Sequence, residues 1–113
     1  MQQDDYKTIE YIISELNFGI DVLKEKYPDT ELFDEIITRA LTLTEINVGE
    51  SVKRLSDNIK SEFPDIPWKV IAGARDVAAH KYSMMSANRI IDTIRFDFPV
   101  LLEQLTDILS KLT

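Results

Sequence analysis

One short segment, ARDVAAHKYS at residues 74–83, holds the only histidine of the chain together with an arginine and a tyrosine. Arg75 precedes His80 by five residues, and Tyr82 follows it by two. A histidine exchanges protons near neutral pH, and an arginine carries a permanent planar charge that matches phosphate oxygens. The pair suits RNA cleavage by transesterification, in which the 2′-hydroxyl attacks, His80 moves a proton and Arg75 stabilises the charge on phosphorus, without a metal ion. A lone histidine near a helix end can equally be structural.

The spacing of Arg75 and His80 limits how the two can act together. Five residues of an uninterrupted helix turn the chain by about 500°, which leaves the side chains about 140° apart around the axis. One straight helix therefore cannot bring both to a single phosphate. Either the helix ends between them, or the site is composite and two copies of the chain face each other across a two-fold axis. We favour the composite site and expect a homodimer.

Charge is distributed unevenly along the chain. The net charge is −7, but residues 51–95 carry 8 basic and 5 acidic side chains, whereas residues 1–50 carry 4 basic and 12 acidic ones. The basic excess surrounds the histidine motif, and a dimer would gather it into one cleft. A solvated helix face rich in lysine would give the same local excess.

The composition excludes several kinds of site. The 113 residues include no cysteine and one histidine, so the chain can form no disulfide and no zinc–thiolate site, and a tetrahedral zinc site is not expected. We expect neither a metal nor another cofactor. The first residues, MQQDDYKTIEY, are acidic where a signal peptide needs positive charge, and no apolar run approaches about 18 residues. We therefore expect a cytoplasmic protein with no membrane partner.

The elements that must hold this motif are predicted to be helices. Apolar residues recur every three or four positions in the first half of the chain and predict a first helix that ends near Pro28. A second helix of about 30 residues is predicted from Asp29 or Thr30 to the FPDIP segment at residues 63–67. Its expected buried stripe is Phe33, Ile37, Ala40, Leu43, Asn47, Val52, Leu55 and Ile59.

The second half of the chain predicts two further helices. Pro67 suits the first turn of a third helix that ends near the histidine or the tyrosine of the motif. The last helix should begin after Ser86, and Pro99 should kink it. Together the four helices predict an all-α, up-and-down four-helix bundle that forms one domain over residues 1–113. The expected buried stripe of the last helix is Ile91, Ile94, Phe98, Leu101, Leu105, Ile108 and Leu112.

Two residues within these helices suit packing or function. Gly49 lies inside the second predicted helix, where glycine costs roughly 1 kcal/mol relative to alanine. A close helix crossing explains it better than a functional role, because glycine lets two backbones approach. Trp68 could stack on a nucleotide base, but at the start of a short helix we expect it to be a packing residue.

The stretch GESVKRLSDNIKSEFPDIPWKVIAGARDVAAHKYS, residues 49–83, resembles the HepT-type toxins of the HEPN (higher eukaryotes and prokaryotes nucleotide-binding) superfamily. The resemblance rests on the GE of the long helix, the PWKVI that opens the third, an R-x4-H followed by x-Y, and a late DFP before an apolar tail. It implies a homodimeric, metal-independent RNase whose site forms at the dimer interface. Such a protein would be the toxin of a type II/VII-like toxin–antitoxin system and would cleave RNA, with tRNA as one candidate, and not DNA.

Site residues follow from the resemblance position by position. Arg75 and His80 correspond to the catalytic pair, Asp76 takes the polar position after the arginine, and Glu50 of the GE supports the site. Tyr82 corresponds to the tyrosine that a partner antitoxin, an MntA-type minimal nucleotidyltransferase, modifies with AMP to silence the toxin. Asp76 departs from the family pattern, in which asparagine is common, and adds negative charge beside the phosphate site.

A different class of function fits the same helices. A non-catalytic helical module could bind a nucleotidyltransferase and help it to hold a substrate, and a third possibility is a bundle that only dimerises. An arginine and a histidine at this spacing favour the enzyme, because a pure scaffold needs neither.

Overall fold

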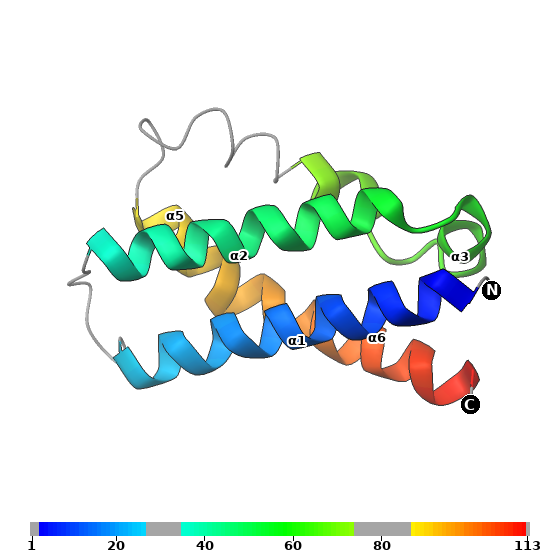
Figure 1. Cartoon of the computed structure of the whole chain (residues 1–113), viewed down its shortest axis with the longest axis horizontal. Helices are drawn as coiled ribbons and strands as arrows, with labels where there is room; N and C mark the ends of the chain where they lie inside the picture. Colours follow the sequence, from blue (N-terminus) through cyan, green and yellow to red (C-terminus); the bar gives the residue numbers. More distant parts are fainter. Residues whose placement is uncertain (1–2, 27–34, 74–86, 113) are drawn as a thin grey trace.

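The molecule is built from helices that pack side by side. The computed structural model describes residues 3–26, 35–73 and 87–112. In Figure 1 the two longest helices, α1 and α2, run antiparallel along the long axis, and α1 contacts both α2 and α6. This arrangement confirms the predicted all-α bundle. The described elements are α1 (Gln3–Lys26), α2 (Glu35–Arg54), α3 (Asp57–Glu62), α5 (Ala87–Asp92), the π-helical η2 (Thr93–Asp97), α6 (Phe98–Leu112) and a helical stretch at residues 68–73.

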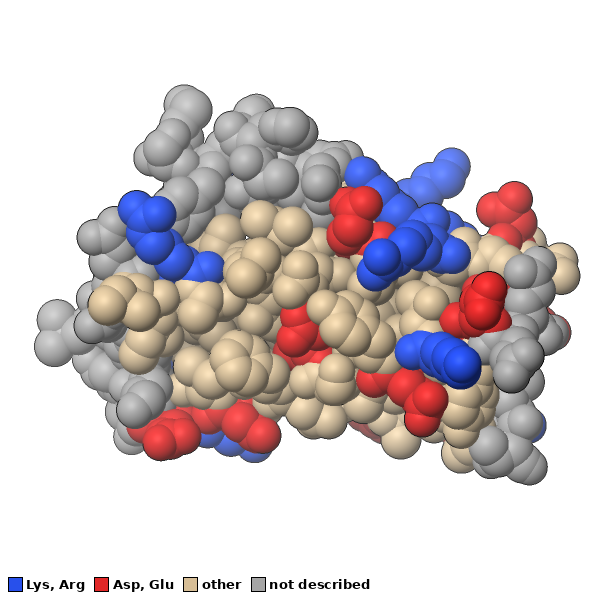
Figure 2. Space-filling view, in the orientation of Figure 1, with Lys and Arg blue, Asp and Glu red and all other residues tan. Residues whose placement is uncertain are grey.

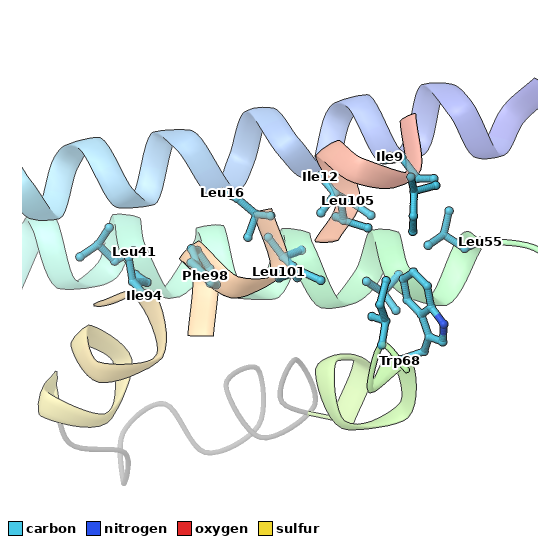
Figure 3. Close-up of a cluster of buried hydrophobic side chains, with 14 of the residues drawn as sticks. Ile9, Ile12, Leu16, Leu41, Leu55, Trp68, Ile94, Phe98, Leu101 and Leu105 are labelled. Carbon is cyan, nitrogen blue, oxygen red and sulfur yellow. The ribbon is translucent and has the colours of Figure 1, made fainter. Parts of the chain in front are cut away.

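The core lies where α1, α2, η2 and α6 meet (Figure 3). The apolar stripe predicted for the last helix is buried from Ile91 to Ile108, which confirms that pattern. Burial of each such side chain stabilises the fold by about 1.5–3 kcal/mol, and these contacts hold the helices against one another. The side chains with no exposed surface include Ile9, Ile12, Leu16, Leu41, Ile90, Ile94 and Leu105.

The buried face of α2 differs from the predicted one. Leu43, which was expected in the core, is 57% exposed, and Leu41 is buried in its place. Two buried threonines explain the difference, because Thr42 donates its hydroxyl to the Thr38 carbonyl at 2.8 Å and Thr44 donates to the Ala40 carbonyl at 3.1 Å. A threonine whose hydroxyl is satisfied within its own helix can be buried, and a pattern based on hydropathy does not register it.

The prediction of one helix of about 30 residues before FPDIP was wrong, because α2 ends at Arg54 and a separate helix, α3, begins at Asp57. Ser56 caps the new helix α3, and its hydroxyl accepts a hydrogen bond from the Ile59 amide at 3.4 Å. Asp5, in the first turn of α1, fixes Ser56 between the two helices. Its carboxylate accepts hydrogen bonds from the Ser56 amide at 2.9 Å and from the Ser56 hydroxyl at 2.5 Å. A partner 51 residues away in sequence therefore ends α2.

We expect Asp5→Ala to lower the free energy of unfolding by about 1–3 kcal/mol, because the Ser56 amide would lose its acceptor in a partly buried position. Urea denaturation monitored by circular dichroism measures the change. Asp4→Ala is the matched control, since Asp4 lies in the same first turn but is exposed. Equal stability of the two variants would show that the contact with Ser56 contributes nothing.

Trp68 is a packing residue, as predicted. Its side chain is 7% exposed, and its indole N–H donates to the Phe63 carbonyl at 3.0 Å. The Pro67 carbonyl accepts from the Ile71 amide at 3.1 Å, which places the start of this helix at the predicted proline. The predicted end of the helix lies outside the described residues.

The last helix, in which the sequence predicted a kink at Pro99, is interrupted by a π-helical turn that ends two residues before this proline. Because Pro99 has no N–H, it cannot donate to the Arg95 carbonyl as an α-helix requires. Directly before it, the Phe98 amide donates to the carbonyl of Thr93, five residues back. One extra residue is thus accommodated between α5 and α6.

Helices approach each other closely at Gly19. A Cβ atom there would lie 3.0 Å from Cε2 of Phe98 and 3.4 Å from Cγ2 of Thr44. The glycine therefore lets α1 approach both α2 and α6. Gly49, the glycine that the sequence singled out for this role, is buried on α2.

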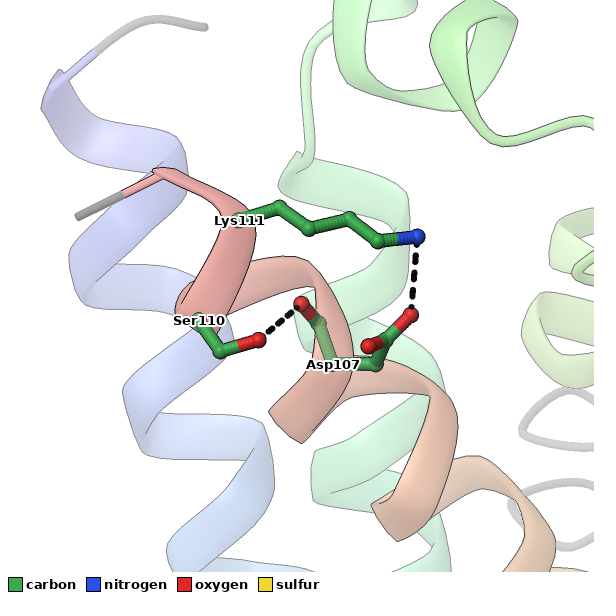
Figure 4. A network of polar contacts seen from close by, with 3 residues as sticks. All are labelled: Asp107, Ser110 and Lys111. Atoms are coloured by element: carbon green, nitrogen blue, oxygen red, sulfur yellow. Dashed lines mark hydrogen bonds and ion pairs between the residues drawn. The ribbon is translucent and has the colours of Figure 1, made fainter.

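The C-terminal turn of α6 carries an exposed polar network (Figure 4). Lys111 Nζ lies 3.0 Å from Asp107 Oδ2, and the Ser110 hydroxyl donates to the Asp107 carbonyl at 2.8 Å. Both charged side chains are more than half exposed, so this pair contributes at most about 1 kcal/mol.

Candidate functional site

Most of the predicted site residues fall in one segment. Arg75, Asp76, His80 and Tyr82 lie within residues 74–86, outside the described residues, so their convergence stays a prediction. Glu50 is described: it lies on α2 and is half-buried.

Described elements flank this segment on both sides. The chain enters it from the helical stretch at residues 68–73 and leaves it into α5 (Figure 1). Lys69 and Arg89 are exposed on these two flanks, and Lys53 and Arg54 lie in the last turn of α2. Figure 2 shows basic side chains gathered over the C-terminal half of α2, with acidic ones interspersed. The flanks therefore carry part of the basic excess that the sequence places around the motif.

A cavity of about 320 Å³, the Glu45 cavity, lies between α2, residues 67–71, η2 and α6. Two of its lining residues, Val70 and Val100, are 70% and 57% exposed, so it opens to solvent. Its walls are mainly apolar, and its polar lining residues are Glu45, Thr93, Asp97 and Gln104. A volume of this size lies at the lower end of the range for small-molecule sites.

Glu45 is the unusual group in this cavity. Its side chain is only 9% exposed, and its Oε2 atom has no hydrogen-bond partner among the described residues. Burial raises the pKa of its carboxyl to about 8; a hydrogen bond with Thr93 opposes the rise, and the charge of Asp97 adds to it. At neutral pH the carboxyl is therefore mainly protonated in the folded protein.

The sequence contained a signal for Glu45 that the predicted stripe missed. Glu45 follows Leu41 by four residues and precedes Val48 by three, and residues at these spacings share one helix face. An acidic residue in register with buried apolar ones indicates a buried carboxyl. The predicted stripe passed through Leu43 instead and left Glu45 on the solvent side.

Two other kinds of feature are absent from the described ranges. No group of three or more His, Asp and Glu side chains there is placed to hold a metal ion. Among the helices of the same ranges, none combines the length and the apolar character that a bilayer crossing requires.

Comparisons with known proteins point to one family. The family model described as "Ribonuclease HepT-like" matches residues 9–108. A protein of Caldanaerobacter subterraneus subsp. tengcongensis named "Putative RNase TTE0752" is 33% identical over 103 residues, which cover 91% of this chain and 92% of the relative. "Putative RNase MJ0125" of Methanocaldococcus jannaschii is 25% identical over 95% of this chain and 89% of the relative. "Probable ribonuclease HepT" of Thermococcus cleftensis is 31% identical over 58% of this chain and 56% of the relative. No solved structure shows significant similarity to the chain.

Proposed function

Because the chain belongs to the HepT-like ribonuclease family, we propose that it is a toxin that cleaves RNA without a metal ion, with Arg75 and His80 as its catalytic pair. The observation that carries this proposal is the match of the family model over residues 9–108, a range that contains the whole R-x4-H motif. His80 is the only side chain in the protein whose ordinary pKa lies near neutrality. It is therefore the natural group to move a proton between the 2′-hydroxyl and the leaving oxygen.

The chemistry balances without a cofactor. The 2′-hydroxyl loses its proton to His80 and attacks phosphorus, the bond to the 5′-oxygen breaks, and that oxygen takes up a proton. The products are a 2′,3′-cyclic phosphate and a 5′-hydroxyl. Arg75 offers two parallel N–H donors to the phosphate oxygens, whose charge grows in the transition state. In a two-fold dimer the Arg75 and His80 of both chains would line one cleft. An arginine of one chain could then act with a histidine of the other, although the two side chains of one straight helix point about 140° apart.

Incubation of the purified chain with mixed cellular RNA in EDTA tests this function. Cleavage that leaves 2′,3′-cyclic phosphate ends is expected. Cleavage only after addition of a divalent metal would overturn the mechanism. Absence of cleavage, together with normal growth of cells that express the chain without its neighbouring reading frame, would favour the non-catalytic module that binds a nucleotidyltransferase.

Control of the toxin is proposed to act at Tyr82. The covalent chain holds the Cα atoms of Tyr82 and His80 within about 7 Å of each other. The Tyr82 hydroxyl would attack the α-phosphorus of ATP, lose its proton and release pyrophosphate, and the partner nucleotidyltransferase would catalyse this transfer. The attached AMP adds bulk and negative charge where an RNA phosphate must bind, so both occlusion and repulsion reduce cleavage.

We expect the chain to gain AMP-sized mass when it is incubated with ATP, magnesium and an MntA-type nucleotidyltransferase, with Tyr82 as the modified residue. Peptide mass spectrometry locates the addition, and RNA cleavage is measured on the same samples. Tyr82→Phe is the matched variant, because it keeps the ring and removes only the hydroxyl. A modification mapped to another residue, or a Tyr82→Phe chain that is still silenced covalently, would rule out this tyrosine.

A further inference from the structure

The Glu45 cavity contains a polar atom that the described residues leave unsatisfied. An unpaired oxygen at this depth costs the fold about as much as a lost hydrogen bond. The walls around it are apolar and come from three separate parts of the chain, represented by Val48, Ile71 and Leu101. An apolar pocket with one buried, unpartnered carboxyl oxygen fits a ligand that has an apolar body and a hydrogen-bond donor at its edge.

The neighbours of Glu45 determine which kind of group Oε2 can bind. The hydroxyl of Thr93 has a single hydrogen and lies 3.0 Å from the Arg89 carbonyl, to which it donates. With that hydrogen committed to Arg89, no described residue donates a hydrogen bond to Oε2 of Glu45. Oε2 then remains as an acceptor, and Asp97 adds acceptor oxygens in the same cavity. The cavity therefore offers acceptors to a ligand that brings N–H donors.

We propose that the Glu45 cavity binds an RNA base through its exocyclic amino group and so selects the nucleotide beside the cleaved bond. This inference rests on the proposed ribonuclease function. Adenine, cytosine and guanine each carry such an amino group, whereas uracil has carbonyl oxygens in its place and only a ring N–H as a donor on that edge. Single-stranded RNA is commonly recognised in this way, with an unstacked base bound on its edge in an apolar pocket.

The surroundings of the cavity suit a nucleotide. Lys69, next to Val70 of the lining, is exposed, and so is Arg89, one helical turn before Thr93. These basic residues lie where they can attract the phosphates while the base enters between apolar walls. Ile71 of the lining precedes Arg75 by four residues, so the covalent chain holds their Cα atoms within about 14 Å. A base in the cavity is thus within reach of the proposed catalytic residue.

Two matched ligand pairs test the proposal: CMP against UMP, and AMP against IMP. In each pair a carbonyl oxygen replaces the amino group and the neighbouring ring nitrogen gains a hydrogen, while the rest of the nucleotide is unchanged. Titration calorimetry on the full chain at pH 7 should show CMP and AMP binding about tenfold or more tightly than UMP and IMP. Glu45→Leu should abolish that preference. Glu45→Gln keeps an acceptor oxygen and should retain it. Glu103→Gln, which removes an exposed charge beside Gln104 on α6, should leave the preference unchanged.

Mapping of cleavage sites in EDTA separates failure of this inference from failure of the proposed function. Cleavage beside A, C and G but rarely beside U, with the bias lost in Glu45→Leu, supports the base pocket. Cleavage at the same rate beside all four bases, in both the wild type and Glu45→Leu, overturns the proposed base pocket but is consistent with the proposed ribonuclease function. Selective binding of CMP and AMP without any RNA cleavage overturns the ribonuclease and supports a pocket for free nucleotides. Equal affinity for CMP and UMP overturns the proposal directly.

Discussion

RNA cleavage in EDTA should fall by roughly two to four orders of magnitude when His80 is replaced by alanine, because general acid–base catalysis contributes about that factor. The chain has no second histidine that could substitute for it. A gel assay of a labelled oligonucleotide measures the rate, and thermal unfolding confirms that the variant is folded. Lys81→Ala is the matched control, since it removes a basic side chain next to the histidine without removing the proton carrier. Equal rates for the wild type and His80→Ala would exclude this mechanism.

The composite site can be tested with the same variants. Arg75→Ala should be as inactive as His80→Ala, because each removes one half of the proposed pair. Mixing the two inactive chains should restore cleavage, since a mixed dimer retains one arginine and one histidine in its shared cleft. A mixture as inactive as its components, or full wild-type activity in a strictly monomeric protein, would contradict a site shared between subunits.

Glu45→Gln should stabilise the protein at high pH by on the order of 5 kcal/mol and leave its stability at pH 4 nearly unchanged. The pKa of Glu45 is raised from 4.5 to about 8 in the folded protein, and each pKa unit corresponds to about 1.4 kcal/mol. The folded state therefore keeps this proton between pH 4.5 and 8 while the unfolded state releases it. The free energy of unfolding decreases across this range and stays low above it, because the buried carboxylate is then charged.

Urea denaturation at several pH values measures this effect as the difference between two curves. Subtracting the wild-type curve from the Glu45→Gln curve removes the titration of all other groups that the two proteins share. Asp97 is the charged group that faces Glu45 from η2, so Asp97→Asn should shift the midpoint of the difference to lower pH. Parallel curves for the wild type and Glu45→Gln would show that Glu45 is not buried in solution.

Local patterns in the sequence predicted those parts of the fold that depend on interactions between residues close together in the chain. The apolar stripe from Ile91 to Ile108 was predicted correctly, and the helix is irregular next to Pro99, where a kink was predicted, since both features depend on neighbours within a few turns. The break at Ser56 was missed because its carboxylate partner comes from α1. The exposure of Leu43 was missed because buried threonines occupy the face that leucines were expected to fill.

In the candidate site, too, the sequence revealed the features that depend on local pattern and missed those that depend on the tertiary fold. Arg75 and His80 could be identified from their residue types and spacing, which express their chemistry directly. The Glu45 cavity could not, because its walls come from α2, residues 67–71 and α6, which only the tertiary fold brings together. A buried carboxyl also looks like any surface glutamate when its helix face has been assigned wrongly.

The π-helical turn at Thr93–Asp97 has a consequence for the evolution of the chain. Such a turn is equivalent to one residue inserted into an α-helix, and each residue rotates everything beyond it by about 100°. The insertion sets the orientation of α5 relative to α6, and it does so in the turn that carries Thr93 and Asp97 to the cavity. A homologue that lacks the extra residue, and has no proline after it, would present another pair of side chains to the carboxyl on α2. Deletion of one codon together with replacement of Pro99 would therefore change the side chains that line this cavity while the apolar stripe of α6 stays in place.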